Sequence, residues 1–537
     1  MKFIKPLLFS VIITISILSC GGTAEILSTP VENIDNTPLK VSDMTEVEER
    51  HWRHLDLIKD TIPGMSVERA YSEIIKGRRG TTTIVAIIDS GVDIDHEDLD
   101  DVIWTNKDEI ANNGKDDDNN GYIDDVHGWN FLGDTQYEQM EYTRLLASGN
   151  ANHPRFNEAK AELEKEYNQA LQNKTQYEQL LQQIKMSDEA IAKHLKKTTY
   201  TREEVNAIKT EDQTLLQHIN IINQVYGFGV GTISETKTEI GNAVKYFTER
   251  LNYHFNKDFR GRKTGDDPND LSDAIYGNNN VKPINKDESH GTHVAGIVAA
   301  ERNNGKGMNG VANNVKIMPI RTVPNGDEYD KDVALAIRYA VDNGAKIINT
   351  SFGKDYSPHS DWVKEAIIYA AEKDVLIVSG SGNDGINIDN KLSFPNDVDG
   401  NGEEFSNNFM SVGALEPKFG SGVVASYSNY GKNNVDIFAP GSLIYSTVPE
   451  SAYKNEQGTS MASPGVAGVA ALIRSQYPSL SAAQVKQILI DSGLPIKTKV
   501  VVGGDPSNVK PFESLSRSGK IANAYNALIM ASKMVNK

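Results

Sequence analysis

Cysteine is almost absent from this chain, which has one cysteine, Cys20, among 537 residues. A single cysteine excludes disulfides within the chain and also excludes the paired cysteines of a zinc finger. Stability in an oxidising compartment must therefore come from packed side chains and from any bound metal ion.

Basic residues are also in the minority. Lysine and arginine total 55 against 73 aspartate and glutamate residues, which gives a formal net charge of −18. Phosphate backbones repel a chain this acidic, and no basic stretch or RNA-binding pattern occurs, so nucleic acid is excluded as a partner. The hydrophobic fraction of 39% is nevertheless large enough for a sizeable core.

Hydrophobic runs long enough to cross a membrane are missing as well. Lys2 and Lys5 precede an apolar run of 12 residues, 7–18, which is typical of an export signal. The run ends at Ser19 and Cys20, in a pattern that resembles the lipobox of bacterial lipoproteins, where the cysteine is lipidated and becomes the new N-terminus. We therefore expect an exported lipoprotein at the outer membrane or facing the periplasm, with plain secretion as the alternative.

Composition divides the chain into four parts. They are a signal peptide (1–19), a tether (20–50), an α/β domain in two pieces (51–133 and 267–537) and a helical insertion (134–266). The tether is expected because residues 21–47 are rich in Gly, Ser, Thr, Pro and acids without any periodicity. Folded structure is expected to begin near Trp52, with a helix over 66–76 that Ser66 caps.

Buried strands are indicated by unbroken apolar, β-branched runs, which suit a parallel sheet covered on both faces. These runs occur at 81–93, 313–323, 345–353 and 374–383. Helical stretches alternate with them, so the expected fold is α/β, a doubly wound, mostly parallel sheet with helices on both faces. In such sheets, functional groups gather at the carboxyl ends of the strands.

The insertion is polar and helical, and it interrupts this alternation. Its apolar residues repeat at helical spacing, which predicts one long amphipathic helix. These residues are Leu163, Tyr167, Ala170, Tyr177, Leu181 and Ile184. A second helix over 214–227 is its expected partner in a helical hairpin or small bundle. Both a passive decoration and a partner-binding site remain open as its role.

Three glycine-flanked stretches supply an acid, an imidazole and a hydroxyl. Asp89 ends a buried strand, while His290 and Ser460 each begin a helix rich in small residues. A serine hydroxyl becomes nucleophilic when a base removes its proton, and an acid can orient and stabilise that base. Asn383 follows another strand in a glycine loop, where its amide and the Ser460 backbone N–H can face a developing oxyanion.

The stretches AIIDSGVD, HGTHVAGI, SGSGNDG and GTSMASPGVAGVAALI resemble the subtilisin-like serine proteases, the subtilase family. The resemblance covers residues 52–133 and 267–530, and it implies a serine endopeptidase acting on proteins or peptides. It carries over Asp89, His290 and Ser460 as the triad and Asn383 as the oxyanion donor. It also implies that Ser351, Phe352 and Gly353 bind the substrate backbone as an added strand.

Two kinds of metal site arise from the sequence. His290 and His293 have the spacing of a metal pair, but they lack a zinc protease's carboxylate, and the resemblance makes His293 structural. Residues 113–125 instead alternate oxygen ligands around a glycine, as calcium loops do. The expected calcium ligands are Asp116, Asp118, Asn120 and Asp124, and a solvated acidic loop is the alternative.

The resemblance implies a second calcium site at Asp98 and Asn304, where the second loop is one residue longer than in the family. Two rival functions also stay open. One is a catalytically silent binding protein that engages a partner through the insertion, and the other is a narrow processing protease. No feature of the sequence sets the oligomeric state.

Overall fold

A computed structural model describes residues 28–32, 34, 37–227, 231–399 and 401–536. At its centre is a nine-stranded sheet with the order β10-β13-β7-β6-β5-β4-β1-β3-β2. The strands are β1 (Thr83–Asp89), β2 (Trp129–Asn130), β3 (Val315–Arg321), β4 (Ile347–Thr350), β5 (Leu376–Gly380), β6 (Phe409–Leu415), β7 (Ile437–Pro440), β10 (Leu494–Pro495) and β13 (Lys520–Ile521). All pairs are parallel except β10 with β13. The predicted fold class is therefore confirmed.

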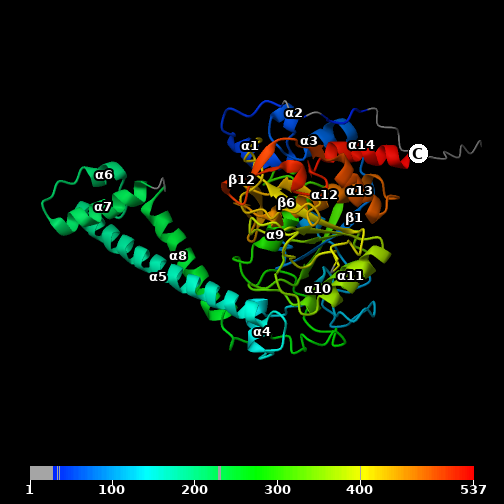
Figure 1. The fold of residues 1–537 in the computed structure, drawn as a ribbon, viewed down its shortest axis with the longest axis horizontal. Helices are drawn as coiled ribbons and strands as arrows, with labels where there is room; N and C mark the ends of the chain where they lie inside the picture. Colours follow the sequence, from blue (N-terminus) through cyan, green and yellow to red (C-terminus); the bar gives the residue numbers. More distant parts are fainter. Residues whose placement is uncertain (1–27, 33, 35–36, 228–230, 400, 537) are drawn as a thin grey trace, which may run out of the picture.

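Helices cover both faces of the sheet (Figure 1). Because side chains alternate along a strand, Val85 and Ile87 of β1 join one buried cluster while Ala86 and Ile88 join the other. The first cluster includes residues of α9 (His290–Ala299), α12 (Thr459–Gln476), α13 (Ala482–Ser492) and α14 (Ala524–Val535). The second includes residues of α10 (Asp330–Asp342) and α11 (Ser360–Glu372).

The chain order switches direction at β1, which lies between β3 and β4 in the sheet. The loops that follow neighbouring strands diverge at such a point, and the crevice between them is where ligands bind in doubly wound sheets. Two antiparallel hairpins lie outside the sheet. They are β8 (Ile444–Val448) with β9 (Ala452–Glu456), and β11 (Lys499–Val502) with β12 (Asp505–Pro511).

The segment expected to be a tether instead packs on the α/β domain. Ile34 is fully buried, and the backbone of Val31 makes two hydrogen bonds with the Asn526 side chain, at 2.8 and 3.0 Å. Thr45 and Glu48 form a capping box that begins α1 (Glu46–His51). Folded structure thus begins before Trp52, because a few buried apolar residues and a cap suffice to hold this polar segment.

Short helices follow in the N-terminal part, namely η2 (Trp52–His54), α2 (Leu57–Asp60), α3 (Val67–Arg69) and a π-helix (Ala70–Ile75). The helix expected over 66–76 is present in this divided form. The expected cap is wrong, because Ser66 has a left-handed backbone and makes no capping hydrogen bond. Its hydroxyl instead accepts a 2.7 Å hydrogen bond from Asn523.

The insertion forms an arm that leaves the α/β domain (Figure 1). Its elements are α4 (Glu141–Ala147), α5 (Phe156–Leu195), α6 (Arg202–Asn206), α7 (Gln213–Gly227), α8 (Ile233–Glu249) and a π-helix (Arg250–His254). With 40 residues, α5 is about 60 Å long. Apolar residues of α5, α6, α7 and α8 form a separate buried cluster that holds the outer part of the arm together.

The long helix and its α7 partner agree with the expected helical bundle, but two details differ. The third helix, α8, also packs along α5, and it was not anticipated. Tyr167 and Tyr177 were expected on the buried face, yet they are 41% and 37% exposed. Tyr177 nevertheless stacks on Phe247 of α8, with the ring centroids 5.9 Å apart. The apolar stripe of α5 therefore packs along α8 but stays partly exposed at these two positions.

No helix within the described part of the chain is both long enough and apolar enough to span a membrane. The predicted signal peptide and Cys20 lie outside the described residues.

Candidate active site

Asp89 and His290 meet at the carboxyl end of β1. His290 Nδ1 lies 2.8 Å from Asp89 Oδ1 and donates a hydrogen bond to it. Asp89 is 1% exposed, and its Oδ1 also accepts from the Ser90 backbone N–H at 2.7 Å. A buried acid in this position fixes the orientation of the imidazole and leaves its Nε2 as the proton acceptor.

His290 stays close to β1 because the next residue has no side chain. A Cβ at Gly291 would lie 2.3 Å from the Gly91 backbone oxygen, so no other residue fits here. Burial lowers the pKa of His290, but the Asp89 carboxylate more than offsets this and leaves the pKa above the ordinary 6.5. The imidazole side chain is 37% exposed and can reach both a substrate and a proton donor.

Ser460 is the second residue of α12, and a proline four residues later leaves its carbonyl oxygen without the usual helical hydrogen bond. Pro464 has no N–H to donate to the Ser460 carbonyl oxygen. The Ser351 hydroxyl takes that place with a 2.9 Å hydrogen bond. The Ser460 hydroxyl in turn donates to the Ser351 carbonyl at 3.1 Å, and among the described residues it makes no hydrogen bond with His290. These two bonds tie the start of α12 to the end of β4.

Asn383 is held by its amide oxygen, and its amide nitrogen makes no hydrogen bond with any described residue. Its Oδ1 accepts from the backbone N–H and the hydroxyl of Thr459, at 2.9 and 3.1 Å. A carbon at the Cβ position of Gly458 would lie 3.5 Å from Asn383 Nδ2 and 3.6 Å from the Ser460 nitrogen. Two N–H donors therefore border one small space, which is empty of side-chain atoms because residue 458 is glycine.

Ser351, Phe352 and Gly353 continue the line of β4 along the same crevice. The N–H and C=O groups of Phe352 and Gly353 make no hydrogen bond with any described residue, whereas the next residue, Lys354, pairs with Phe394 on both sides of its backbone. Free backbone groups in an extended segment can pair with an added strand.

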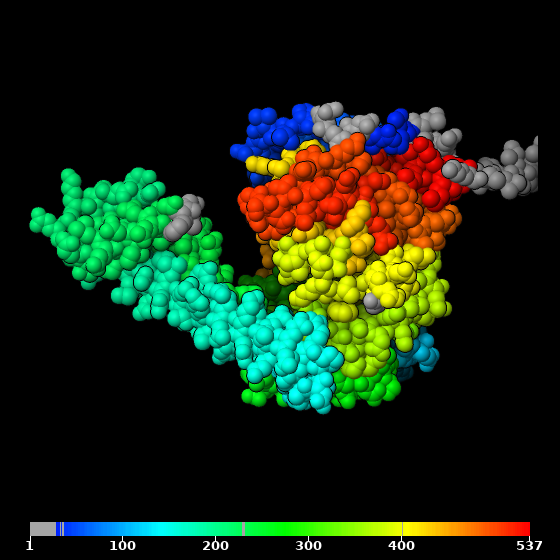
Figure 2. Space-filling model, viewed as in Figure 1, coloured from blue at the N-terminus to red at the C-terminus, as the bar shows by residue number. Residues whose placement is uncertain are grey.

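The arm forms the far wall of this crevice. One cavity contains Ser460, Asn383 and Gly353 on the α/β side and Glu162, Glu166 and Arg250 of the arm on the other. A second cavity, beside His290, includes Tyr137, Lys245 and Glu249 from the same insertion. Figure 2 shows the hollow between the arm and the body of the molecule.

His293 occupies a structural position inside the α/β domain. It is fully buried, its Nε2 lies 3.2 Å from the Lys454 carbonyl oxygen, and burial lowers its pKa to about 4. The ring is therefore neutral at physiological pH and occupies the interface between α9 and β9.

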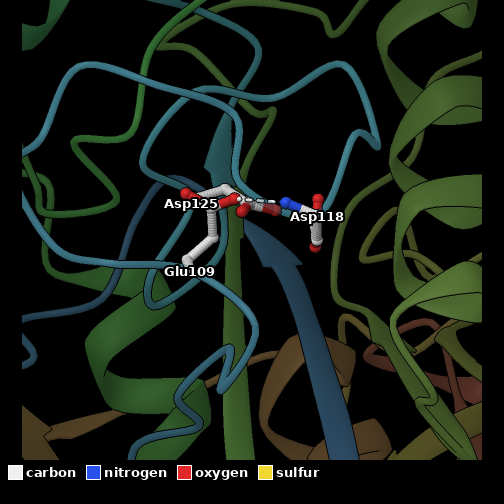
Figure 3. A group of neighbouring side chains, drawn as sticks. All are labelled: Glu109, Asp118 and Asp125. Carbon is white, nitrogen blue, oxygen red and sulfur yellow. Dashed lines mark hydrogen bonds between the residues drawn. The ribbon is translucent and has the colours of Figure 1, made fainter.

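The acidic loop brings together a different set of oxygens from the one expected. Ligand atoms of Glu109, Asp118 and Asp125 lie within 4.8 Å of one another (Figure 3). The carboxylates of Asp116 and Asp124 accept backbone N–H groups of their own loop instead. Of the four expected ligands, Asp118 is in the cluster and Asn120 donates its amide to it. The other two expected carboxylates, Asp116 and Asp124, stabilise the turns of the loop instead.

Glu109 is the member of this cluster that has a buried oxygen without a hydrogen-bond partner. It is 8% exposed, its Oε1 accepts two backbone N–H groups, and its Oε2 is buried without a hydrogen-bond partner. Burial and the neighbouring acids raise the pKa of Glu109 and of Asp125. Within the described residues, the three acids form no ion pair with lysine or arginine.

The second expected calcium pair does meet. Asn304 Nδ2 donates to Asp98 Oδ1 at 2.6 Å, and the Met308 backbone N–H donates to Asp98 Oδ2 at 3.2 Å. Protein donors thus already satisfy the Asp98 carboxylate.

Sequence reasoning missed the roles of Glu109, Asp125, Thr459 and Gly458, as well as the arm residues in the crevice. Gly458 and Thr459 immediately precede the nucleophile candidate, in a stretch expected only to be rich in small residues. Contacts with the arm leave no local pattern, because they join residues far apart in the chain.

Several known proteins are similar to this chain. The subtilase family model matches residues 80–510. The cell wall-associated protease of Bacillus subtilis (strain 168) is 40% identical over 237 residues, which are 44% of this chain and 24% of that protein. The thermophilic serine proteinase of Bacillus sp. (strain AK1) is 43% identical over 190 residues, 35% of this chain and 43% of that protein.

Thermitase of Thermoactinomyces vulgaris is 37% identical over 218 residues, 40% of this chain and 72% of that protein. A solved structure of proteases from Pseudoalteromonas arctica PAMC 21717 covers 90% of this chain and 97% of its own, with 22% identity and a TM-score of 0.45. The chain spans less than half the length of the first two relatives.

Proposed function

Because the chain belongs to the subtilase family, we propose that it is a serine endopeptidase acting on proteins or peptides. The observation that carries this proposal is the crevice at the carboxyl end of β1. There the hydrogen-bonded Asp89–His290 pair, the Ser460 hydroxyl and the N–H groups of Asn383 and Ser460 come from separate elements. Ser351 lines both the cavity that contains Ser460 and the cavity that contains His290. Acyl transfer to serine needs this combination of an oriented base, a nucleophile and oxyanion donors.

The first half of the reaction acylates Ser460. The substrate strand pairs with Phe352 and Gly353, and the Ser460 hydroxyl turns from the Ser351 carbonyl towards His290. His290 Nε2 takes the proton as Ser460 Oγ bonds to the peptide carbonyl carbon. Asn383 Nδ2 and the Ser460 N–H stabilise the oxyanion. The carbon–nitrogen bond then breaks, and His290 gives its proton to the leaving amine.

The second half releases the acid. A water molecule enters where the amine left, His290 removes one of its protons, and the hydroxide oxygen bonds to the acyl carbon. The same two N–H donors stabilise the second oxyanion. The ester bond to Ser460 breaks, the proton on His290 returns to Ser460 Oγ, and the free enzyme is restored. Asp89 stays ionised throughout and stabilises the imidazolium.

The pH dependence of hydrolysis should report His290. The base is active when neutral, and its pKa lies above 6.5, so kcat/KM should rise with pH through a midpoint above 6.5. Among the charges acting on this pKa, Glu456 raises it and Lys454 lowers it. Glu456→Gln should move the midpoint of a pH–rate profile to lower pH, and Lys454→Gln should move it to higher pH. Midpoints that move together, or not at all, would contradict this assignment.

Calcium is proposed as a structural ion at Glu109, Asp118 and Asp125. The support is the donor set, which consists of hard oxygens, and the buried Glu109 Oε2 that has no protein partner. The ion would neutralise carboxylates that otherwise repel one another beside β3. This set differs from the four-ligand set expected from the sequence. Asp118 and Asp125 also accept hydrogen bonds, from Asn106 and Asn120, as Asp98 does from Asn304. The buried Glu109 Oε2 without a partner is therefore what favours this set over Asp98 with Asn304.

Removal of calcium should therefore lower thermal stability. We expect EDTA to lower Tm by about 3–5 °C, since an ion bound by the folded state alone adds to the free energy of unfolding. Glu109→Gln should abolish the response to EDTA. Asp116→Asn is the control, because it makes the same acid-to-amide change outside the cluster, in the loop that follows Glu109, and it should keep the response. An unchanged wild-type Tm in EDTA would exclude the site.

Export and lipid attachment at Cys20 are proposed from the sequence pattern around residues 7–20, and one relative is named as cell wall-associated. The arm, residues 134–266, is proposed as an insertion into a discontinuous peptidase domain, 51–133 and 267–537. The expected position of the anchored protein is the outer membrane or facing the periplasm.

One experiment tests the nucleophile and the anchor together. A serine-directed fluorophosphonate is added to the protein purified from membranes, and the labelled chain is analysed by mass spectrometry. We expect one adduct on Ser460 and a lipid mass on Cys20 at the mature N-terminus. An adduct on another serine would refute the proposed nucleophile, and an unmodified or absent Cys20 would refute the anchor.

A further inference from the structure

The arm contributes charged side chains to the cavity that contains Ser460. Glu162 and Glu166 come from successive turns of α5, and Arg250 comes from the π-helix that follows α8. Contacts at the base of the arm fix this wall. Arg155 donates to the Asp355 carbonyl at 2.6 Å, and its guanidinium stacks 3.7 Å from the Tyr356 ring.

Both cations in the cavity wall already have carboxylate partners. Arg250 Nη2 lies 3.3 Å from Glu166 Oε2. Lys354 is nearly buried, with its Nζ 2.8 Å from Glu141 and 3.0 Å from Asp330. Both positive charges are therefore offset within the wall. One acid in the wall is neutralised as well, since Lys391 lies 2.6 Å from Asp355.

Three other carboxylates in the same wall have no such partner. Within the described residues, Glu162, Asp327 and Asp384 form no ion pair. Tyr356 donates to Glu162 at 2.8 Å, the Glu141 backbone N–H donates to Asp327 at 2.7 Å, and Asn429 contacts Asp384 at 3.3 Å. Arg144 contacts the Asp327 backbone carbonyl, but its charge is paired with Glu141. Burial raises the pKa of Asp327 to about 6, so its charge is the weakest of the three. Lys391, which pairs with Asp355, also lies near enough to Glu162 and Asp384 for both to raise its pKa. Glu162 and Asp384 therefore carry most of the negative charge of the cavity that has no direct ion pair.

Such a wall favours a cation supplied from outside. A carboxylate held by a neutral hydroxyl keeps its charge and spare lone pairs, and lysine or arginine can satisfy them with charge-assisted hydrogen bonds. Glu162 is the member that only the arm supplies, and the Tyr356 hydroxyl fixes its position. A neutral or acidic substrate side chain would leave these charges unpaired or repel them.

We propose that the arm builds an acidic subsite that binds a lysine or arginine side chain of the substrate beside the scissile bond, with Glu162 as its main contact. The inference rests on the proposed peptidase function. It gives the insertion a role in specificity and places basic protein segments among the preferred substrates.

Binding is measured first, on the Ser460→Ala protein, so that turnover is not needed. Fluorescent peptides of one parent sequence carry lysine, glutamine or glutamate at each position in turn, and anisotropy gives Kd. We expect the lysine peptide to bind ~10-fold tighter than the glutamine peptide at one or two positions, with the glutamate peptide weakest. Higher salt should reduce the preference. Equal Kd values at every position would overturn the proposal.

Variants then locate the preference in the arm. Glu162→Gln should remove most of the lysine preference and leave Kd for the glutamine peptide unchanged, and Glu162→Lys should favour the glutamate peptide. Glu164→Gln is the matched control, because Glu164 lies on the same helix but is 66% exposed and outside the cavity. If Glu162→Gln behaves like Glu164→Gln, the subsite is wrong.

Hydrolysis of the same peptides by the wild-type protein tests the acidic subsite and the proposed peptidase activity separately. Cleavage without any charge preference would refute the subsite and keep the peptidase. Lysine-selective binding without cleavage, and without fluorophosphonate labelling of Ser460, would refute the peptidase and keep the subsite.

Discussion

Ser460→Ala is expected to lower kcat for peptide hydrolysis by ~10⁴-fold or more, with little change in KM. The loss is this large because the acyl-enzyme cannot form without the hydroxyl, while the oxyanion donors and the substrate strand remain. The Ser460 hydroxyl donates one hydrogen bond, to the Ser351 carbonyl, and its removal leaves no buried donor unpaired. Folding should therefore be preserved, and hydrolysis of denatured casein or a fluorogenic peptide provides the measurement.

Ser514→Ala is the control for this change. Ser514 is exposed and bonds within its own turn, so its variant should keep full activity. Equal hydrolysis by the wild-type and Ser460→Ala proteins would support the rival function of a catalytically silent binding protein. In that case the cavity between arm and body would be a binding surface alone.

The α/β fold could be predicted from the sequence because its main strands are continuous apolar runs. A strand that is buried on both faces must be apolar at successive positions, and this pattern is visible in the sequence. The places of Asp89, His290, Asn383 and Ser460 follow from the same rule, since each stands at a strand end or a helix start. Their mutual arrangement then follows from sheet topology, which carries residues far apart in the chain to one edge.

What could not be predicted depends on tertiary contacts. The proposed metal cluster includes Glu109, which precedes the acidic loop. The carboxylates of Asp116 and Asp124 instead accept backbone N–H groups that only the folded loop presents. The acidic subsite depends on Tyr356 reaching Glu162 across the crevice. Periodicity predicted the helix that carries Glu162 but not the surface on which that helix would lie.

Thr459 has a place that the sequence pattern predicts and a role that only its tertiary contacts reveal. Its N–H and hydroxyl hold Asn383 Oδ1, and this turns the Asn383 amide nitrogen towards the space beside the Ser460 N–H. The hydrogen of a backbone N–H is fixed by geometry, so the orientation of the Asn383 amide follows from the contact itself. Thr459, the residue before the proposed nucleophile, therefore positions Asn383 as the proposed oxyanion donor. Gly458, one residue earlier, keeps the space open.

Gly458→Ala is expected to lower kcat by ~10³-fold, because removal of one oxyanion donor typically costs 10²–10³-fold and this change obstructs two. The new methyl carbon would lie 3.5 Å from Asn383 Nδ2 and 3.6 Å from the Ser460 nitrogen, where the oxyanion must bind. The backbone φ of +151° adds strain that glycine avoids.

Three variants distinguish obstruction of the oxyanion space from a loss of folding stability. Asn383→Ala should lose ~10²-fold in kcat by removing one donor without filling the space. Gly422→Ala introduces the same methyl group where no atom lies within 4 Å, and it should retain full activity. Gly458→Ala should still react slowly with fluorophosphonate at Ser460 and keep Tm within a few degrees, since the Asp89–His290 pair is untouched. Wild-type kcat in Gly458→Ala would show that the oxyanion is stabilised elsewhere, because a methyl group and an oxyanion cannot occupy one space.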